Sequence, residues 1–491
     1  MDLFFTDYFR VSPRTLKKYG AFDISLLSDL PLFIDPFLLF NSNKSRYRRL
    51  HDEIIEYLRF LRDRSVQGRV TPGLIAAWYR FPEVKQTWLG FARESNRGSG
   101  LGKHFAVALD ENLHHIFSDF GDEKVTHGSH LEKLCLIGIG VGRDNISDFT
   151  TNLIKNFLCE YTERFAKKYV RPKLRRKVPV PRVQFNYETE TWERGEYDLP
   201  WSGNDYVLLT PKDILTKEET WINKADLIDE FENLPDAIPN VELRAQINNY
   251  FLRQLPPPTR KKREPTKKER GEAARLTLLQ FPQIIDFFIR YKEDQGERAQ
   301  SIASERVSFS ERLYIHQGKQ LAELLAASTA FYHVPGNTYE EAHGRIRFLK
   351  EVIENKGGHR IFYVNGRPIE REEDIHVLYR LVWFATPSDV SREVNDGRGP
   401  ADFKISRGSQ DKTIVEFKLA SNSQLRRNLR RQAEIYSEAS DASHAIKVIV
   451  YFTHEEYERV VSILRDLKLL DSKDIVLVDA RRDNKPSASK A

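Results

Sequence analysis

The chain has 491 residues, too many for one compact domain of ordinary size, so two or three domains are expected. Apolar residues make up 40% and charged residues 30%, a balance that excludes a chain unable to bury a core. The net charge of +6 is a small excess, but basic residues gather in three clusters, around residues 167–182, 260–268 and 426–431.

Cysteine usage and hydropathy exclude two further classes of protein. Cys135 and Cys159 are too few for a disulfide framework and lack metal-ligand spacing. No apolar run approaches the length of a membrane span, and the start Met1-Asp2-Leu3-Phe4 lacks the features of a secretory signal. We therefore expect a cytoplasmic protein that does not act at a membrane.

Residues 1–255 are expected to form a mixed α/β region. Helical periodicity marks residues 52–62 and 149–169, whereas residues 134–139 and 205–209 are typical of strands. A basic linker, residues 256–271, begins at Pro256-Pro257-Pro258. A helical connector, residues 272–335, follows, with amphipathic helices over 273–292 and 311–327.

Residues 336–480 are expected to form the last domain, followed by a disordered polar tail, residues 481–491. A helix is predicted over 372–384 and a short strand over 389–394. Residues 401–405 and 413–419 alternate apolar and polar side chains and form a hairpin around a turn at 407–412. Leu425 and Leu429 mark the next helix, and then a strand over 446–452, a helix over 455–467 and a strand over 474–478 complete the order.

The hairpin carries the most informative residues of the chain. Pro400-Ala401-Asp402 stands on its first strand and Val415-Glu416-Phe417-Lys418 on its second. The period of two places Glu416 and Lys418 on one face, with Val415 and Phe417 on the other. Two carboxylates can bind a hard divalent cation, and a nearby lysine can stabilise developing negative charge. Asp402 must then lie opposite Glu416 or Lys418, because a register slip of one residue turns it away.

Pro400, Asp402, Glu416 and Lys418 together resemble the motif of the PD-(D/E)XK nuclease superfamily, and the element order from residue 372 resembles its αβββαβ core, the restriction-endonuclease-like fold. The resemblance implies that Asp402 and Glu416 bind Mg²⁺, which Mn²⁺ can replace, and that Lys418 is catalytic. Gln432 and Tyr436, one helical turn apart, match the QxxxY element that many members carry beside the site.

Glu372 is the best candidate for the third acid that the first core helix often supplies. The alternative is that the acids Glu372, Glu373 and Asp374 only favour a helix N-terminus electrostatically. Glu393 and Asp396 precede the hairpin and can also approach the metal.

Four arginines on the helix after the motif are candidates for binding a phosphate backbone: Arg426, Arg427, Arg430 and Arg431. The alternative is a solvated helix face.

The sequence thus predicts an enzyme, a Mg²⁺-dependent nuclease that cuts nucleic acid, with DNA favoured over RNA. By analogy it resembles restriction-like and anti-phage defence nucleases, in which an appended domain decides when cutting occurs. The N-terminal region would sense a target, bind a partner protein or restrain the activity, and a homodimer is possible. Two alternatives stay open: a nuclease-derived module that binds nucleic acid without cutting, and an assembly protein that shares only the fold. The sequence leaves sequence specificity and the activation trigger open.

Overall fold

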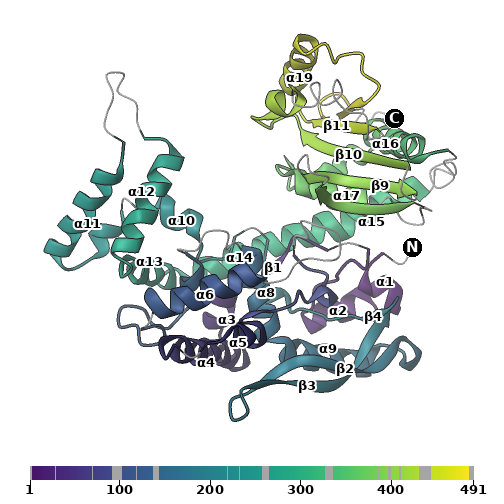
Figure 1. Ribbon diagram of the computed structural model, residues 1–491. Helices are drawn as coiled ribbons and strands as arrows, with labels where there is room; N and C mark the ends of the chain where they lie inside the picture. The colour runs from purple at the N-terminus through teal and green to yellow at the C-terminus, as the bar shows by residue number, and fades with distance from the viewer. Residues whose placement is uncertain are drawn as a thin grey trace.

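The computed structural model describes residues 3–485 except 28, 69, 91–101, 118, 137–142, 218, 232, 257–264, 327–335, 382, 384, 385, 387, 396–399, 408–410 and 431–443. The fold is mixed α/β, as the sequence predicts. Figure 1 shows the N-terminal region below, a C-terminal sheet with flanking helices above, and a long helix between them.

Helices dominate the N-terminal region, and a three-stranded sheet of order β2-β3-β4 lies along one side of it. Strand β1 pairs with β5 in a separate small sheet. The elements are α1 (Phe5–Phe9), α2 (Pro13–Tyr19), β1 (Phe33–Ile34), α3 (Pro36–Phe40), α4 (Ser45–Val66), α5 (Pro72–Leu74), η1 (Ile75–Tyr79), η2 (Lys85–Thr87), α6 (Lys103–His115), α7 (Lys133–Leu136), α8 (Arg143–Leu153), α9 (Lys155–Tyr169), η3 (Pro172–Leu174), β2 (Arg175–Asn186), β3 (Thr191–Ser202), β4 (Asp205–Tyr206), η4 (Lys212–Ile214) and β5 (Leu215–Thr216).

Three N-terminal predictions need correction. The strand expected over residues 205–209 is shorter, since β4 spans only Asp205–Tyr206. The strand expected over residues 134–139 is wrong in its described part, since α7 spans Lys133–Leu136. A short apolar run cannot be distinguished from a buried helical turn by periodicity alone. The helix expected over residues 149–169 is divided at Ile154, whose backbone leaves helical geometry between α8 and α9.

The connector is helical, as expected, and begins earlier than expected. α12 begins at Lys267, inside the stretch predicted to be linker, because Thr266 and Glu269 form a capping box. Pro282 separates α12 from α13, where one helix was predicted. The N-terminal region ends with α10 (Lys224–Asp229), η5 (Leu234–Ala237) and α11 (Val241–Gln254). The connector holds α12 (Lys267–Gln280), α13 (Ile284–Glu293), α14 (Gly296–Ser310), η6 (Glu311–Gln317) and α15 (Gly318–Ala326).

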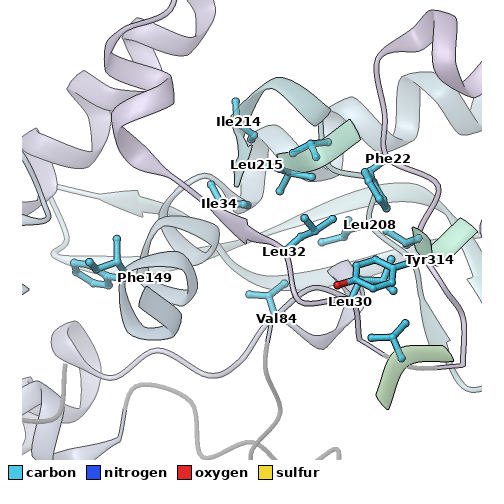
Figure 2. Packing of buried hydrophobic residues seen from close by; sticks show 14 of the residues in the cluster. Phe22, Leu30, Leu32, Ile34, Val84, Phe149, Leu208, Ile214, Leu215 and Tyr314 are labelled. Carbon is cyan, nitrogen blue, oxygen red and sulfur yellow. The ribbon is translucent and has the colours of Figure 1, made fainter. Parts of the chain in front are cut away.

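α14, η6 and α15 follow one another without a break and carry the chain from the N-terminal region to the C-terminal sheet. The π-helical turn η6 places Tyr314 in the N-terminal core. Figure 2 shows its ring close to Leu30, near the cluster formed by Leu32 and Leu208. One hydrophobic core therefore extends from the N-terminal region through the connector to one face of the C-terminal sheet.

The C-terminal sheet has the strand order β12-β11-β10-β9-β8. β8, β9 and β10 are antiparallel neighbours, whereas β11 runs parallel to β10 and β12 parallel to β11. The elements are α16 (Thr338–Asn355), η7 (Gly358–Phe362), β6 (Tyr363–Val364), β7 (Arg367–Pro368), α17 (Glu372–Leu381), β8 (Asp389–Asn395), β9 (Pro400–Arg407), β10 (Asp411–Leu419), β11 (Ala445–Tyr451), α19 (His454–Asp466) and β12 (Ile475–Asp479), with residues 425–430 also helical.

Helices cover both faces of this sheet. On one face α16 and α17 pack against β10, and Tyr379 of α17 contacts the rings of Phe403 and Phe417. On the other face Leu425 and Leu429 join α19 over Ile449 in a second, smaller core. The element order after residue 372 matches the predicted order.

α16 is the main C-terminal element that the sequence analysis missed. A capping box of Asn337 and Glu340 begins the helix, and the buried side chains of Ile346, Leu349 and Ile353 follow at helical spacing. These two signals together could have identified it.

Residues 481–485 are placed against the sheet, where a disordered tail was expected. The carboxylate of Asp479 accepts hydrogen bonds from Arg481 and Asn484 and pairs with Lys485, which holds the chain against the sheet as far as Lys485.

Candidate functional site

Strand register brings the predicted residues of β9 and β10 together. The last paired residues are Val415 and Phe403, so Asp402 and Glu416 are the next residues along the two strands. The condition on the register of Asp402 is therefore met. The ladder ends at this point, and Asp402 Oδ2 instead accepts the Phe417 N–H at 2.6 Å.

Lys418 lies between two carboxylates. Its Nζ is 3.1 Å from Glu372 Oε2 and 3.6 Å from Asp402 Oδ2. The side chains of Lys418 and Asp402 are each 14% exposed, so both are mostly buried but remain accessible to solvent. Burial lowers the pKa of Lys418, but Asp402 and Glu372 outweigh burial and raise it, so Lys418 is charged at neutral pH.

α17 contributes Glu372 from its first residue. Glu372 Oε1 accepts the backbone N–H of Leu419 at 3.2 Å and the side-chain amide of Asn422 at 2.9 Å. Glu372 does lie in the first turn of the helix, where an acid is electrostatically favourable. Its contacts with the end of β10 go beyond that role, because they join α17 to the motif strand.

His376, one turn further along α17, is a site residue that the sequence analysis missed. Its Nε2 lies 3.1 Å from Asp402 Oδ2, although the two are not aligned as a hydrogen bond. Burial alone would raise the pKa of Asp402, but His376, Lys418 and the Phe417 N–H together lower it to about 2. Asp402 is thus an anion over the whole physiological pH range. The i, i+4 spacing of Glu372 and His376 on an amphipathic helix was the available signal.

Lys447 of β11 is the second missed residue. β11 pairs with β10 in parallel, with Lys447 beside Glu416, and its Nζ lies 2.9 Å from Glu416 Oε2. The Lys447 side chain is 5% exposed, which is rare for a lysine and requires the paired carboxylate. Its position in an otherwise apolar strand, Ala445–Tyr451, was the signal that could have found it.

The remaining predicted residues are either undescribed or on the surface. Gln432, Tyr436 and Arg431 fall outside the described residues, as does Asp396, and the side chain of Glu393 is not among those described. Arg426 pairs with Asp466 of α19 on the exposed surface, whereas Arg427 and Arg430 are exposed on the same helix.

The donor chemistry of the site fits Mg²⁺, because Asp402 and Glu416 offer hard oxygen ligands from adjoining positions of paired strands. In the described parts of the chain, however, no group of three or more His, Cys, Asp or Glu side chains is arranged to hold a metal ion. Each carboxylate instead has a basic side chain beside it: Lys418 and His376 for Asp402, and Lys447 for Glu416. Metal binding would therefore compete with these ion pairs.

Comparison with known families gives two matches. Residues 10–223 match a Domain of unknown function (DUF8370), and residues 338–454 match a second Domain of unknown function (DUF8371). The second match contains every site residue described above, from Glu372 to Lys447. No curated protein and no solved structure matches the chain. Within the described residues, no helix is long and apolar enough to cross a membrane.

Proposed function

We propose that the protein is a Mg²⁺-dependent nuclease of the PD-(D/E)XK kind that hydrolyses phosphodiester bonds, with DNA as the favoured substrate. The observation that carries the proposal is the convergence of Asp402, Lys418 and Glu372 at one end of β10, with Glu416 at the adjoining position. The order of one helix, three antiparallel strands, a helix and a parallel strand supports a restriction-endonuclease-like core. A role in restriction-like or anti-phage defence stays part of the proposal by analogy only.

Each residue has a definite role in this proposal. Asp402 and Glu416 would hold the cation, which polarises the phosphate and acidifies a water when bound. Lys418 keeps its ammonium at the same site and stabilises negative charge that develops on the phosphate. Glu372 and His376 hold Lys418 and Asp402 in place from α17.

A second candidate is a module that binds nucleic acid without cutting it. The ion pair between Lys447 and Glu416 favours it, because a carboxylate held by a buried lysine is less available to a metal. In that case Lys418 and Lys447 would serve the stability of the sheet, and the arginines of residues 425–430 would carry the binding.

A plasmid-cleavage assay with purified full-length protein distinguishes the two candidates. We expect cleavage with Mg²⁺ or Mn²⁺, none with EDTA, and none from Asp402→Ala or Glu416→Ala, while both variants still bind the plasmid. Glu458→Ala is the matched control, because this acid is 69% exposed on α19, and it should cut normally. Cleavage by either site variant, or binding without any cleavage in the wild type, would overturn the nuclease proposal.

A further inference from the structure

The junction of α9 and β2 carries the strongest concentration of positive charge in the N-terminal region. Residues 164–187 contain no Asp or Glu. The basic residues of this segment are Arg164, Lys167, Lys168, Arg171, Lys173, Arg175, Arg176, Lys177 and Arg182.

Some of these cations already have partners within the fold. Lys167 pairs with Glu163 at 2.8 Å, and Arg175 pairs with Asp198 of β3 at 3.3 Å. Arg182 is half-buried between the rings of Phe81 and Trp192. These three residues stabilise the region itself.

Of the other six, all exposed, Arg164 lies earlier in α9, and five surround the end of α9, the turn η3 and the start of β2. We call them the junction patch: Lys168, Arg171, Lys173, Arg176 and Lys177. They lie within ten consecutive residues. Because this segment contains no Asp or Glu, its positive charges are not offset locally. On the paired strand β3, Asp198 lies opposite Lys177 and Glu196 opposite Pro179. Asp198 is already paired with Arg175.

We propose that the junction patch binds the phosphate backbone of duplex nucleic acid. A row of lysines and arginines without acids displaces the counterions that are condensed on a polyphosphate, and this release favours binding. The nearby rings each have a cation of the patch over one face, Arg176 over Trp201 at 4.5 Å and Lys168 over Tyr169 at 5.3 Å. This arrangement favours contact with phosphates over stacking of unpaired bases.

The alternative of a protein strand added to this edge is disfavoured by the sequence of β2. β2 is an edge strand of its sheet. Pro179 and Pro181 lie in the middle of β2 and have no N–H to donate to an added strand.

The junction patch belongs to the N-terminal region, and the candidate nuclease site to the C-terminal sheet. In Figure 1 the β2–β3 hairpin is at the bottom and the five-stranded sheet at the top. The inference goes beyond the proposed cleavage, because it gives the N-terminal region a nucleic-acid contact of its own. Its test measures binding in EDTA, so its failure and the failure of the nuclease proposal are distinguishable.

The test compares two triple variants of the full-length chain by fluorescence anisotropy with a labelled duplex over a range of salt concentrations. The patch variant is Lys168→Gln, Lys173→Gln and Lys177→Gln. The control variant is Arg48→Gln, Arg49→Gln and Lys124→Gln, which removes the same charge from exposed positions elsewhere in the N-terminal region. Circular dichroism and thermal melting check that both variants fold.

We expect the patch variant to bind about tenfold to a hundredfold more weakly near 0.1 M salt and to flatten the salt slope by up to about three units. The control should stay within about threefold of the wild type. An equal loss of duplex affinity in the two variants would show that only the total charge of the protein matters, and would overturn the proposal. Wild-type binding to phosphatidylserine vesicles but not to the duplex would assign the patch to a membrane surface and overturn it equally.

Discussion

At the scale of single residues, two lysines share the candidate site but hold different carboxylates. Lys418 lies between Glu372 and Asp402, whereas Lys447 pairs with Glu416 beneath the helix of residues 425–430. In the proposed nuclease only Lys418 stabilises the transition state. Lys447 instead holds Glu416, so a metal ion would have to compete with its ammonium for that carboxylate.

Substituting each lysine should therefore change a different kinetic quantity. Lys418→Met should lower the turnover of DNA cleavage by about two to four orders of magnitude, as for loss of a positioned electrostatic group, with little change in the Mg²⁺ midpoint. Lys447→Met should lower the Mg²⁺ concentration for half-maximal cleavage, because the metal no longer competes with an ammonium. Cleavage titrated with Mg²⁺ for both variants measures the difference. If Lys447→Met abolishes turnover while Lys418→Met cuts normally, the two roles are exchanged.

At the scale of elements, α17 connects the candidate site to the rest of the chain. Asp374, between Glu372 and His376, is 1% exposed and points the other way. Its Oδ1 accepts Lys217 Nζ of the N-terminal region at 2.8 Å and the hydroxyl of Tyr314 of η6 at 2.5 Å. One carboxylate thus joins three regions of the chain and sets the position of the helix that holds Lys418 and Asp402.

Breaking this contact should impair cleavage at a distance. Lys217→Met leaves a buried carboxylate without its cation, which costs about 3–5 kcal/mol and displaces α17. Because a small misplacement of positioning groups can cost about a hundredfold in rate, we expect a tenfold to hundredfold loss of cleavage with duplex binding retained.

Lys319→Met is the matched control. It removes another ion pair between the N-terminal region and a later helix, with Asp7 at 2.7 Å, but that pair is partly exposed and does not involve α17. Cleavage rates well below the melting temperature measure both variants. Equal rates for Lys217→Met and the control would show that α17 is positioned without the N-terminal region.

At the scale of the whole molecule, the connector contributes part of the hydrophobic core that covers the C-terminal sheet. Leu313, Ile315 and Leu321 of the connector are buried in the cluster that also contains Ile346 of α16 and Leu378 of α17. α15 contacts α16, α17 and η7 directly. A domain boundary placed at residue 336 therefore cuts through a packed interface.

Two fragments test this boundary. The fragment 336–491 loses the helices that cover α16 and α17, so it should expose apolar surface and melt without a sharp transition. The fragment 296–491 keeps α14, η6 and α15 and should melt cooperatively in one sharp transition. Thermal melting and binding of a hydrophobic dye measure both. A shorter fragment as stable as the longer one would show that the sheet folds independently of the connector.

The sequence by itself determined the hairpin of the C-terminal region and the place of Glu416 and Lys418 on it, but not α16, His376 or Lys447. Alternation in residues 401–405 and 413–419 is enough to predict the hairpin, because side chains of a half-buried strand must alternate between core and solvent. The same alternation places Glu416 and Lys418 on one face, and the structure adds that Asp402 and Glu372 reach Lys418.

Only the tertiary structure decided which cation holds which carboxylate. Lys447 reaches Glu416 through the parallel pairing of β10 with β11, and His376 reaches Asp402 through the packing of α17 on the sheet. Lys217 and Tyr314 meet Asp374 across sequence separations of 157 and 60 residues. Periodicity reports only which face of an element is buried, so contacts between elements far apart in the chain depend on packing that no local pattern encodes.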